Sequence, residues 1–216
     1  PGTAPVTKLA PRSIASQHDL PFFVETLATG KPLDLIFRED ARLPEPDSLT
    51  LGEQLCRVFQ TLHEGLRRSN LDFQPGNVFW DRALRRITVV DWDWLSAEEE
   101  ADVVADLENI ARLLYRLMVG TGFVQDRFTE PAGWELLTSG SRDFLARALH
   151  PHAPRRFPSA AGMREVLEQL AAWWGQLPDQ LIEEAAQRLG QVAQFPPEVR
   201  EAGCHTVLGI LDIARQ

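Results

Sequence analysis

Apolar residues recur at three- and four-residue steps over most of the chain, the spacing that places them on one face of an α-helix. Between positions 49 and 66 this pattern predicts an amphipathic helix, with Ser48 as a candidate N-cap. Between 102 and 120 the apolar stripe is wide enough to predict a helix buried on more than one side. Further helices are predicted at 33–40, 134–137, 141–149 with Ser141 as cap, 159–175, 177–190 and 198–215.

Three short runs instead have the composition of β-strands. The first, 21–27, is followed by a Gly- and Pro-containing stretch at 28–32 that is expected to end it. The other two, 78–80 and 87–90, flank a charged turn and are predicted to pair as a β-hairpin. Residues 1–20 show no lasting period and are expected to form a poorly structured lead-in. The fold class expected is mainly α with a small β-hairpin.

Composition limits the possible functions. The chain has 216 residues, of which 44% are hydrophobic and 25% charged, enough for a sizeable core in one large or two small domains. With 22 basic and 31 acidic residues the formal net charge is -9, which argues against a broad nucleic-acid-binding surface.

The cysteines and the hydropathy pattern indicate a compartment. Cys56 and Cys204 show neither the density of a disulfide scaffold nor a metal-binding spacing, so we interpret both as buried thiols in a reducing environment. No apolar run is long enough to cross a bilayer, and the N-terminus has no signal-peptide pattern. A cytoplasmic protein is therefore expected. The first residue is Pro1, which suggests a piece of a longer protein.

Candidate chemistry gathers around the predicted hairpin. Asp72 and Asn77 precede its first strand, and Asp91 follows its second. Pairing of the strands would bring all three residues to one end of the ribbon. One Asp and one Asn suit Mg²⁺, which leaves its other positions for water and phosphate, while a second Asp could hold a hydroxyl nucleophile. Alternatively, Asp72 and Asn77 are turn residues whose side chains bond nearby backbone amides.

The order Asp-x-x-x-x-Asn, hairpin, Asp resembles the catalytic and metal-binding loops of the protein-kinase-like family. The resemblance runs from about 21 to 170 and implies a kinase-like C-terminal lobe. It implies that Asp72 is catalytic, that Asn77 and Asp91 bind Mg²⁺, and that Asp106 holds the catalytic loop from the start of a central helix. By the same resemblance, the backbone of Glu25, Thr26 and Leu27 forms the hinge beside the adenine of ATP.

Other segments support this resemblance. Leu62-His63-Glu64-Gly65 resembles the end of the helix before the catalytic loop, and His63 is expected to be a structural hydrogen-bonding residue. His150 to Ser159 resembles the closing signature of the family, in which Arg156 would pair with the Glu of an Ala-Pro-Glu anchor. No such Glu is present, so Arg156 needs another acid or lies in solvent.

The sequence also departs from the family. Asn70-Leu71-Asp72 stands where an active protein kinase has His-Arg-Asp, which argues against a phosphorylation-dependent switch. Asp91-Trp92-Asp93 replaces Asp-Phe-Gly; Asp93 would add charge to the metal site or lie at the surface, and we favour the surface. Only fourteen residues separate Asp91 from Asp106, too few for a full activation segment with its peptide-docking platform.

The small lobe of the family is largely missing from this chain. Residues 1–20 contain no Gly-x-Gly-x-x-Gly, and Lys8 is expected to be a surface residue. The domain division expected is therefore 1–20 lead-in or remnant of the small lobe, 21–32 hinge-like strand and turn, 33–175 large lobe and 176–216 additional helices.

Three hypotheses follow. The first is a Ser/Thr-protein-kinase-like, ATP-dependent phosphotransferase that uses Mg²⁺ and is completed by a small lobe supplied from outside this chain. The second is a pseudokinase or scaffold domain that binds partner proteins, for which the C-terminal helices offer a surface. The third is an unrelated helical binding module. The sequence favours the first, and it leaves the acceptor and the oligomeric state open.

Overall fold

The computed structural model describes residues 27–39, 42–70, 72–92, 95–96, 102–120 and 134–176. Several of the sequence-based expectations concern residues outside these ranges. They are the lead-in at 1–20 with Lys8, the strand at 21–27 except Leu27, Asp93, the helices at 177–190 and 198–215, and Cys204.

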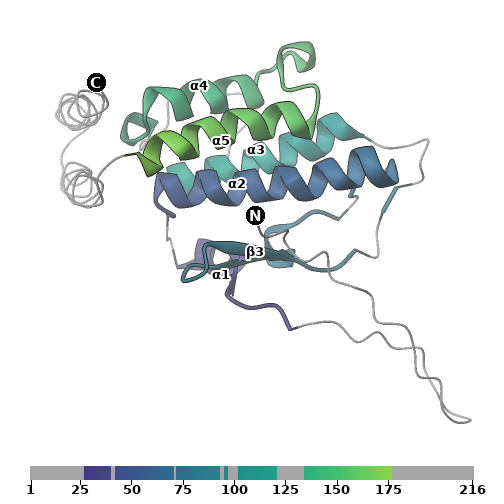
Figure 1. The fold of residues 1–216 in the computed structure, drawn as a ribbon, viewed down its shortest axis with the longest axis horizontal. Helices are drawn as coiled ribbons and strands as arrows, with labels where there is room; N and C mark the ends of the chain where they lie inside the picture. The colour runs from purple at the N-terminus through teal and green to yellow at the C-terminus, as the bar shows by residue number, and fades with distance from the viewer. Residues whose placement is uncertain are drawn as a thin grey trace, which may run out of the picture.

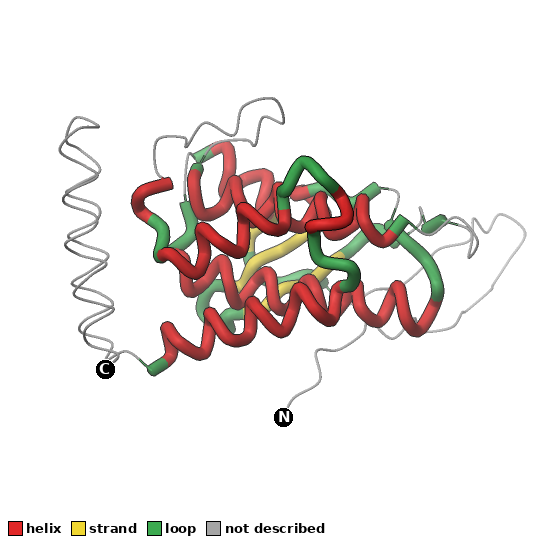
Figure 2. The backbone as a smooth tube through the Cα atoms, turned by 90° about the horizontal axis from the view of Figure 1, so that it is seen from above, coloured by secondary structure: helices red, strands yellow, loops and turns green. Residues whose placement is uncertain are grey.

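Four helices make up the main body of the described structure (Figure 1). They are α2 (Glu45–Gln60), α3 (Val103–Val119), α4 (Ser139–Ala148) and α5 (Ala160–Gly175). α2 packs against both α3 and α5, and the small sheet with the short helix α1 (Leu33–Arg38) lies on the side of α2 (Figures 1 and 2). The fold is thus mainly helical with a small antiparallel sheet, as the sequence predicts.

The helix starts differ from the predicted ones by a few residues. α2 begins at Glu45 rather than Leu49, because Pro44 precedes its first residue and Pro46 lies in its first turn, where proline is tolerated. Ser48 therefore lies inside the helix and is not its cap. α4 is capped by Thr138, whose side chain accepts a hydrogen bond from the backbone N–H of Ser141. The predicted helix from 49 to 66 changes at Thr61 into a π-helical turn, Thr61–Leu66.

The sheet has three antiparallel strands in the order β1-β2-β3. β2 (Val78–Asp81) and β3 (Arg86–Val89) form the predicted hairpin, with Val78 opposite Val89 and Asp81 opposite Arg86. β1 (Lys31–Pro32) pairs with β2 and was not predicted, because the sequence pattern assigns 28–32 to a break after a strand. Proline is compatible with such an edge strand.

A glycine makes the β1 contact possible. Gly30 has φ 91, and a Cβ added to it would lie 2.4 Å from the carbonyl carbon and oxygen of Trp80. Only glycine combines this backbone conformation with such a close approach.

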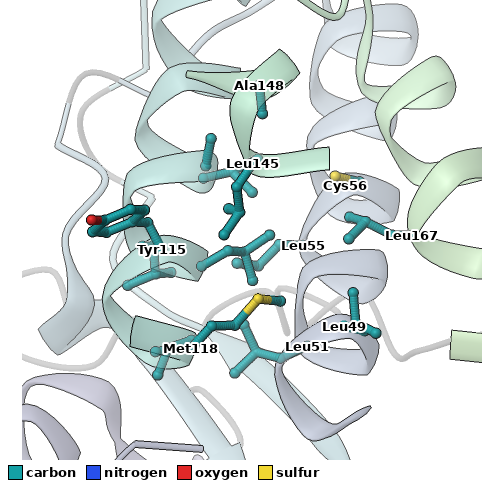
Figure 3. Packing of buried hydrophobic residues seen from close by; sticks show 14 of the residues in the cluster. Leu49, Leu51, Leu55, Cys56, Tyr115, Met118, Leu145, Ala148 and Leu167 are labelled. Atoms are coloured by element: carbon teal, nitrogen blue, oxygen red, sulfur yellow. The ribbon is translucent and has the colours of Figure 1, made fainter. Parts of the chain in front are cut away.

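The hydrophobic core, part of which Figure 3 shows, lies between α2, α3, α4 and α5 and continues into buried residues of α1, β2 and β3. Leu55 on α2, Leu114 on α3 and Leu167 on α5 are each fully buried, and Cys56 faces the same interior. Burial raises the pKa of the Cys56 thiol. No helix in the described part of the chain has both the length and the apolar character needed to cross a bilayer.

A glutamine on α2 holds the hairpin against the helical body. Gln54 donates from Nε2 to the carbonyl of Arg85 at 2.8 Å and accepts from the N–H of Ile87 at 3.0 Å. Arg85 also contacts Asp47 of α2, with 3.2 Å between Nε and Oδ1. These bonds satisfy part of the open edge of β3 and fix the hairpin that carries the candidate site.

Candidate functional site

The open end of the hairpin gathers three of the predicted residues. The N–H of Val90 donates to the carbonyl of Asn77 at 2.9 Å, so the ladder continues beyond Val78 and Val89 to the two residues that flank it. Asn77 Nδ2 lies 3.4 Å from Asp91 Oδ2 and 3.5 Å from the backbone oxygen of Asp72. The structure therefore places Asp72, Asn77 and Asp91 together.

Asp91 has an unusual backbone conformation for a residue with a side chain. Its φ is 63, in the left-handed region, and its side chain is exposed. Aspartate tolerates this region better than most residues, and such conformations cluster at functional sites. The turn directs the chain away from β3 while the carboxylate stays beside Asn77.

Asp72 is half-buried and has contacts on both its backbone and its carboxylate. Its N–H donates to Asn70 Oδ1 at 3.0 Å, and its Oδ2 accepts from Gln74 Nε2 at 3.2 Å. Sequence reasoning did not single out Gln74. The bond holds one carboxylate oxygen in place, and this carboxylate bonds a side chain rather than the backbone amides expected of a simple turn residue.

The loop before Asp72 is fixed from below by a buried acid. Asp106, in the first turn of α3, is 2% exposed and accepts from the N–H of Asn70 at 3.2 Å. It also lies 2.8 Å from His63 Nε2. Burial raises the pKa of Asp106, and the hydrogen bonds from His63 and Asn70 oppose this shift only in part.

A second set of bonds ties the chain after Asp91 to the same loop. Ser96 donates its N–H to the carbonyl of Ser69 at 2.9 Å and accepts the N–H of Ser69 on its hydroxyl at 2.9 Å. The Ser69 hydroxyl in turn accepts from the N–H of Asp102 at 3.0 Å, which fixes the start of α3. Both serines are buried. Nothing in the sequence pattern distinguishes these serines from ordinary loop residues.

The donor set fits Mg²⁺ but does not form a complete metal cage. Among the described residues, no group of three or more His, Cys, Asp or Glu side chains could hold a metal ion. One carboxylate at Asp91 and one amide at Asn77 are instead what an ion needs if it takes its remaining ligands from water and phosphate.

Of the three residues expected to form the hinge, the structure describes only Leu27. Glu25 and Thr26 lie outside the described residues, and Leu27, the first described residue, is 88% exposed.

Comparisons with known proteins give one kind of match. No family model matches the chain, and no curated protein matches it. Among solved structures 190 chains match, including the crystal structure of Rad53 1-466 in complex with AMP-PNP, a protein kinase. Its TM-score is 0.51 at 16% sequence identity, and the match covers 69% of this chain and 46% of that chain. The fold is kinase-like. At this identity the likeness shows the fold alone, and this chain matches less than half of the length of that structure.

Arg156 is held by a carboxylate of α3 and by a backbone carbonyl. From the sequence, Arg156 was expected to need another acid or to lie in solvent, and in the structure its Nη1 contacts Glu108 Oε2 of α3. Arg156 Nε also donates to the carbonyl of His150 at 2.6 Å. Burial would raise the pKa of Glu108, but its bonds with Arg112 and Arg156 outweigh this effect and lower it. The central helix thus supplies the acid that the sequence lacked at the expected place.

Proposed function

We propose that this chain forms the large lobe of a kinase-like, ATP-dependent phosphotransferase. In this proposal Asn77 and Asp91 hold Mg²⁺ on the ATP phosphates, and Asp72 orients the acceptor hydroxyl. Residues 33–175 are the large lobe and 21–32 the hinge, where Glu25 to Leu27 lie beside the adenine. A Gly-rich loop and a Lys come from sequence outside this chain, and residues 176–216 offer a surface to a partner protein.

The observation that carries the proposal is the contact between Asn77 and Asp91 at the open end of the hairpin. The two residues are 14 positions apart, and the hairpin register places their side chains 3.4 Å apart. Asp72 approaches the same Asn77 amide through its backbone oxygen. In this proposal Asn77 and Asp91 are the metal-binding pair, and the carboxylate of the neighbouring loop residue Asp72 accepts the proton of the acceptor.

The charges at the site suit a nucleotide only when a cation is present. Asp72 and Asp91 are both acidic and would repel the phosphates of ATP by themselves. Asn77 and Asp91 would hold Mg²⁺, whose positive charge would offset this repulsion. The bond from Asn77 Nδ2 to Asp91 Oδ2 holds the two side chains next to each other.

Asp72 is suited to orientation of a hydroxyl. Gln74 occupies its Oδ2, while its backbone is held by Asn70. A carboxylate fixed in this way presents one oxygen to an incoming hydroxyl in a defined direction.

The proposal is tested by thermal unfolding of the full-length gene product with and without Mg-ATP. Ligand at about 100 times its Kd stabilises the folded state by roughly 2.7 kcal/mol, or about 5 °C or more for a chain of this size. We expect this shift in the wild type and its loss in Asp91→Asn, because Asn tolerates the left-handed conformation but removes the charge that binds the cation. Asp81→Asn, at the turn end of the hairpin, is the matched control and should keep the shift. An Asp91→Asn variant that keeps both Mg-ATP binding and turnover would contradict the proposal.

A pseudokinase or scaffold is the second candidate, and a specific observation favours it. By the resemblance, Asn70 and Leu71 stand where an active kinase has His and Arg, so the loop lacks both of these side chains. A wild-type protein that Mg-ATP does not stabilise would support this alternative.

A further inference from the structure

Asn70 lies at the point where the loop carrying Asp72 meets the helical body. It is 6% exposed, its N–H donates to Asp106 Oδ2 at 3.2 Å, and it forms an isolated β-bridge with Leu95. The backbone of Asn70 is therefore held from two sides by parts of the chain outside the loop.

The side chain of Asn70 holds the backbone of Asp72 by a hydrogen bond. Its Oδ1 accepts from the N–H of Asp72 at 3.0 Å, the local bond that a short amide side chain makes two residues further along. The bond is partly buried, so water is a poor substitute for it.

The other contacts of Asp72 do not reach the helical body. Gln74 contacts its carboxylate from an exposed position on the same loop. Asn77 approaches its backbone oxygen at 3.5 Å, the outer limit of a hydrogen bond. Among the described contacts, the path from Asp106 through Asn70 is the one that reaches the Asp72 backbone N–H from α3. The neighbouring residues are held separately, Ser69 by the N–H of Asp102 at the start of α3 and Phe73 by its ring contact with Phe59 of α2.

We infer that Asn70 is a positioning residue that fixes the backbone of Asp72, whose oxygen lies 3.5 Å from Asn77 Nδ2, relative to α3 and thereby sets the direction of the Asp72 carboxylate. Its consequence for catalysis rests on the proposed function. The hydrogen bond itself does not, and it can be measured separately.

The test uses the full-length gene product with Asn70→Ala, Asn70→Ser and a matched control. Ala removes the acceptor, whereas Ser keeps a hydroxyl that makes a weaker bond of the same kind. Asp81→Ala is the control, because Asp81 Oδ1 accepts from the N–H groups of Ala83 and Leu84 at the turn end of the hairpin. It removes the same type of bond away from the site.

The first measurement is hydrogen exchange of the Asp72 amide, followed by NMR. We expect exchange at least about tenfold faster in Asn70→Ala, partly restored in Asn70→Ser and unchanged in Asp81→Ala. Amides in the middle of α2 and α3 should keep their protection. An Asp72 amide that exchanges at the wild-type rate in Asn70→Ala overturns the inference, as does a general loss of protection with no particular effect at Asp72.

The second measurement is hydrolysis of Mg-ATP, with water as the acceptor. In Asn70→Ala we expect kcat to fall about tenfold or more while KM for Mg-ATP stays within about twofold, because Asn77 and Asp91 are intact. Asn70→Ser should recover part of kcat. An unchanged kcat, or an equal loss in Asp81→Ala, overturns the catalytic part. Absence of turnover in the wild type instead contradicts the proposed function, and the exchange measurement still decides whether Asn70 holds Asp72.

Discussion

Asp106 is a buried carboxylate with two partners, His63 and the N–H of Asn70. Burial disfavours its ionised form, and the negative charge of Asp102 adds to this effect in a smaller measure. Burial of the Asp106 carboxylate therefore lowers the stability of the fold, while its hydrogen bonds fix the loop before Asp72. Buried groups with shifted pKa values are common close to functional sites.

This leads to a pH-dependent prediction. Because the pKa of Asp106 is raised above 3.8 in the folded state, the folded chain binds the proton more tightly than the unfolded chain. The contribution of Asp106 to the unfolding free energy should therefore fall as the pH rises from 3.8 through the raised value, by about 1.4 kcal/mol for each pKa unit of difference. Urea unfolding of the wild type and of Asp106→Asn over this pH range measures the difference. Parallel pH profiles for the two proteins would contradict it.

The sequence was enough to group some site residues in space but not to identify the partners of others. Asp72, Asn77 and Asp91 could be grouped because the hairpin between them is local, and its register follows from two adjacent strands and their turn. Gln74 and Asn70 could not be assigned their bonds, because side-chain direction in a loop depends on the backbone around it. Arg156 was expected to need an acid, but the sequence did not identify Glu108.

Among the helices and strands, β1 could not be predicted from local sequence, because it consists of only two residues. Lys31 and Pro32 pair with Trp80 and Phe79 of β2. No alternation can be seen over two positions, and the strand exists because Gly30 lets the chain approach the backbone of Trp80.

Gly30→Ala tests this dependence. The new Cβ would lie 2.4 Å from backbone atoms of Trp80, in a conformation that side chains rarely adopt. We expect the unfolding free energy to fall by roughly 2 kcal/mol or more, with faster amide exchange in β2. Gly175→Ala, where nothing lies within 4 Å of the added Cβ, should change stability by less than about 0.5 kcal/mol. Equal effects of the two substitutions would show that the close approach is unimportant.

For the molecule as a whole, the bond between Glu108 and Arg156 joins the central helix to the segment before α5. The side chain of Arg156 is 10% exposed and that of Glu108 is 20% exposed, so the pair is largely shielded from solvent. Arg112 makes a second bond to the same carboxylate. The result is a connection across the helical body between α3 and the segment before α5.

Glu108→Gln should weaken this connection. We expect a loss of about 1–3 kcal/mol in unfolding free energy at pH 7, because two arginines lose their acid. The pKa of Glu108 is lowered below 4.5 in the folded state, so the advantage of the wild type is complete above pH 4.5 and should disappear as the pH falls through the lowered value. Chemical unfolding at several pH values measures this. Glu53→Gln, which breaks the pair with Arg57 within α2, is the control and should cost less than about 1 kcal/mol.

Local patterns along the chain were enough to predict α2 to α5 and the hairpin, because helix period and strand alternation depend on neighbouring residues. They were also enough to bring Asp72, Asn77 and Asp91 to one end of the hairpin. Packing of distant segments decided the rest: the pairing of β1 with β2, the Gln54 bonds to β3, the mutual bonds of Ser69 and Ser96, and Glu108 as the partner of Arg156. These contacts join residues far apart in the chain, so which donor meets which acceptor depends on how the helices pack around the core and cannot be read from neighbouring residues.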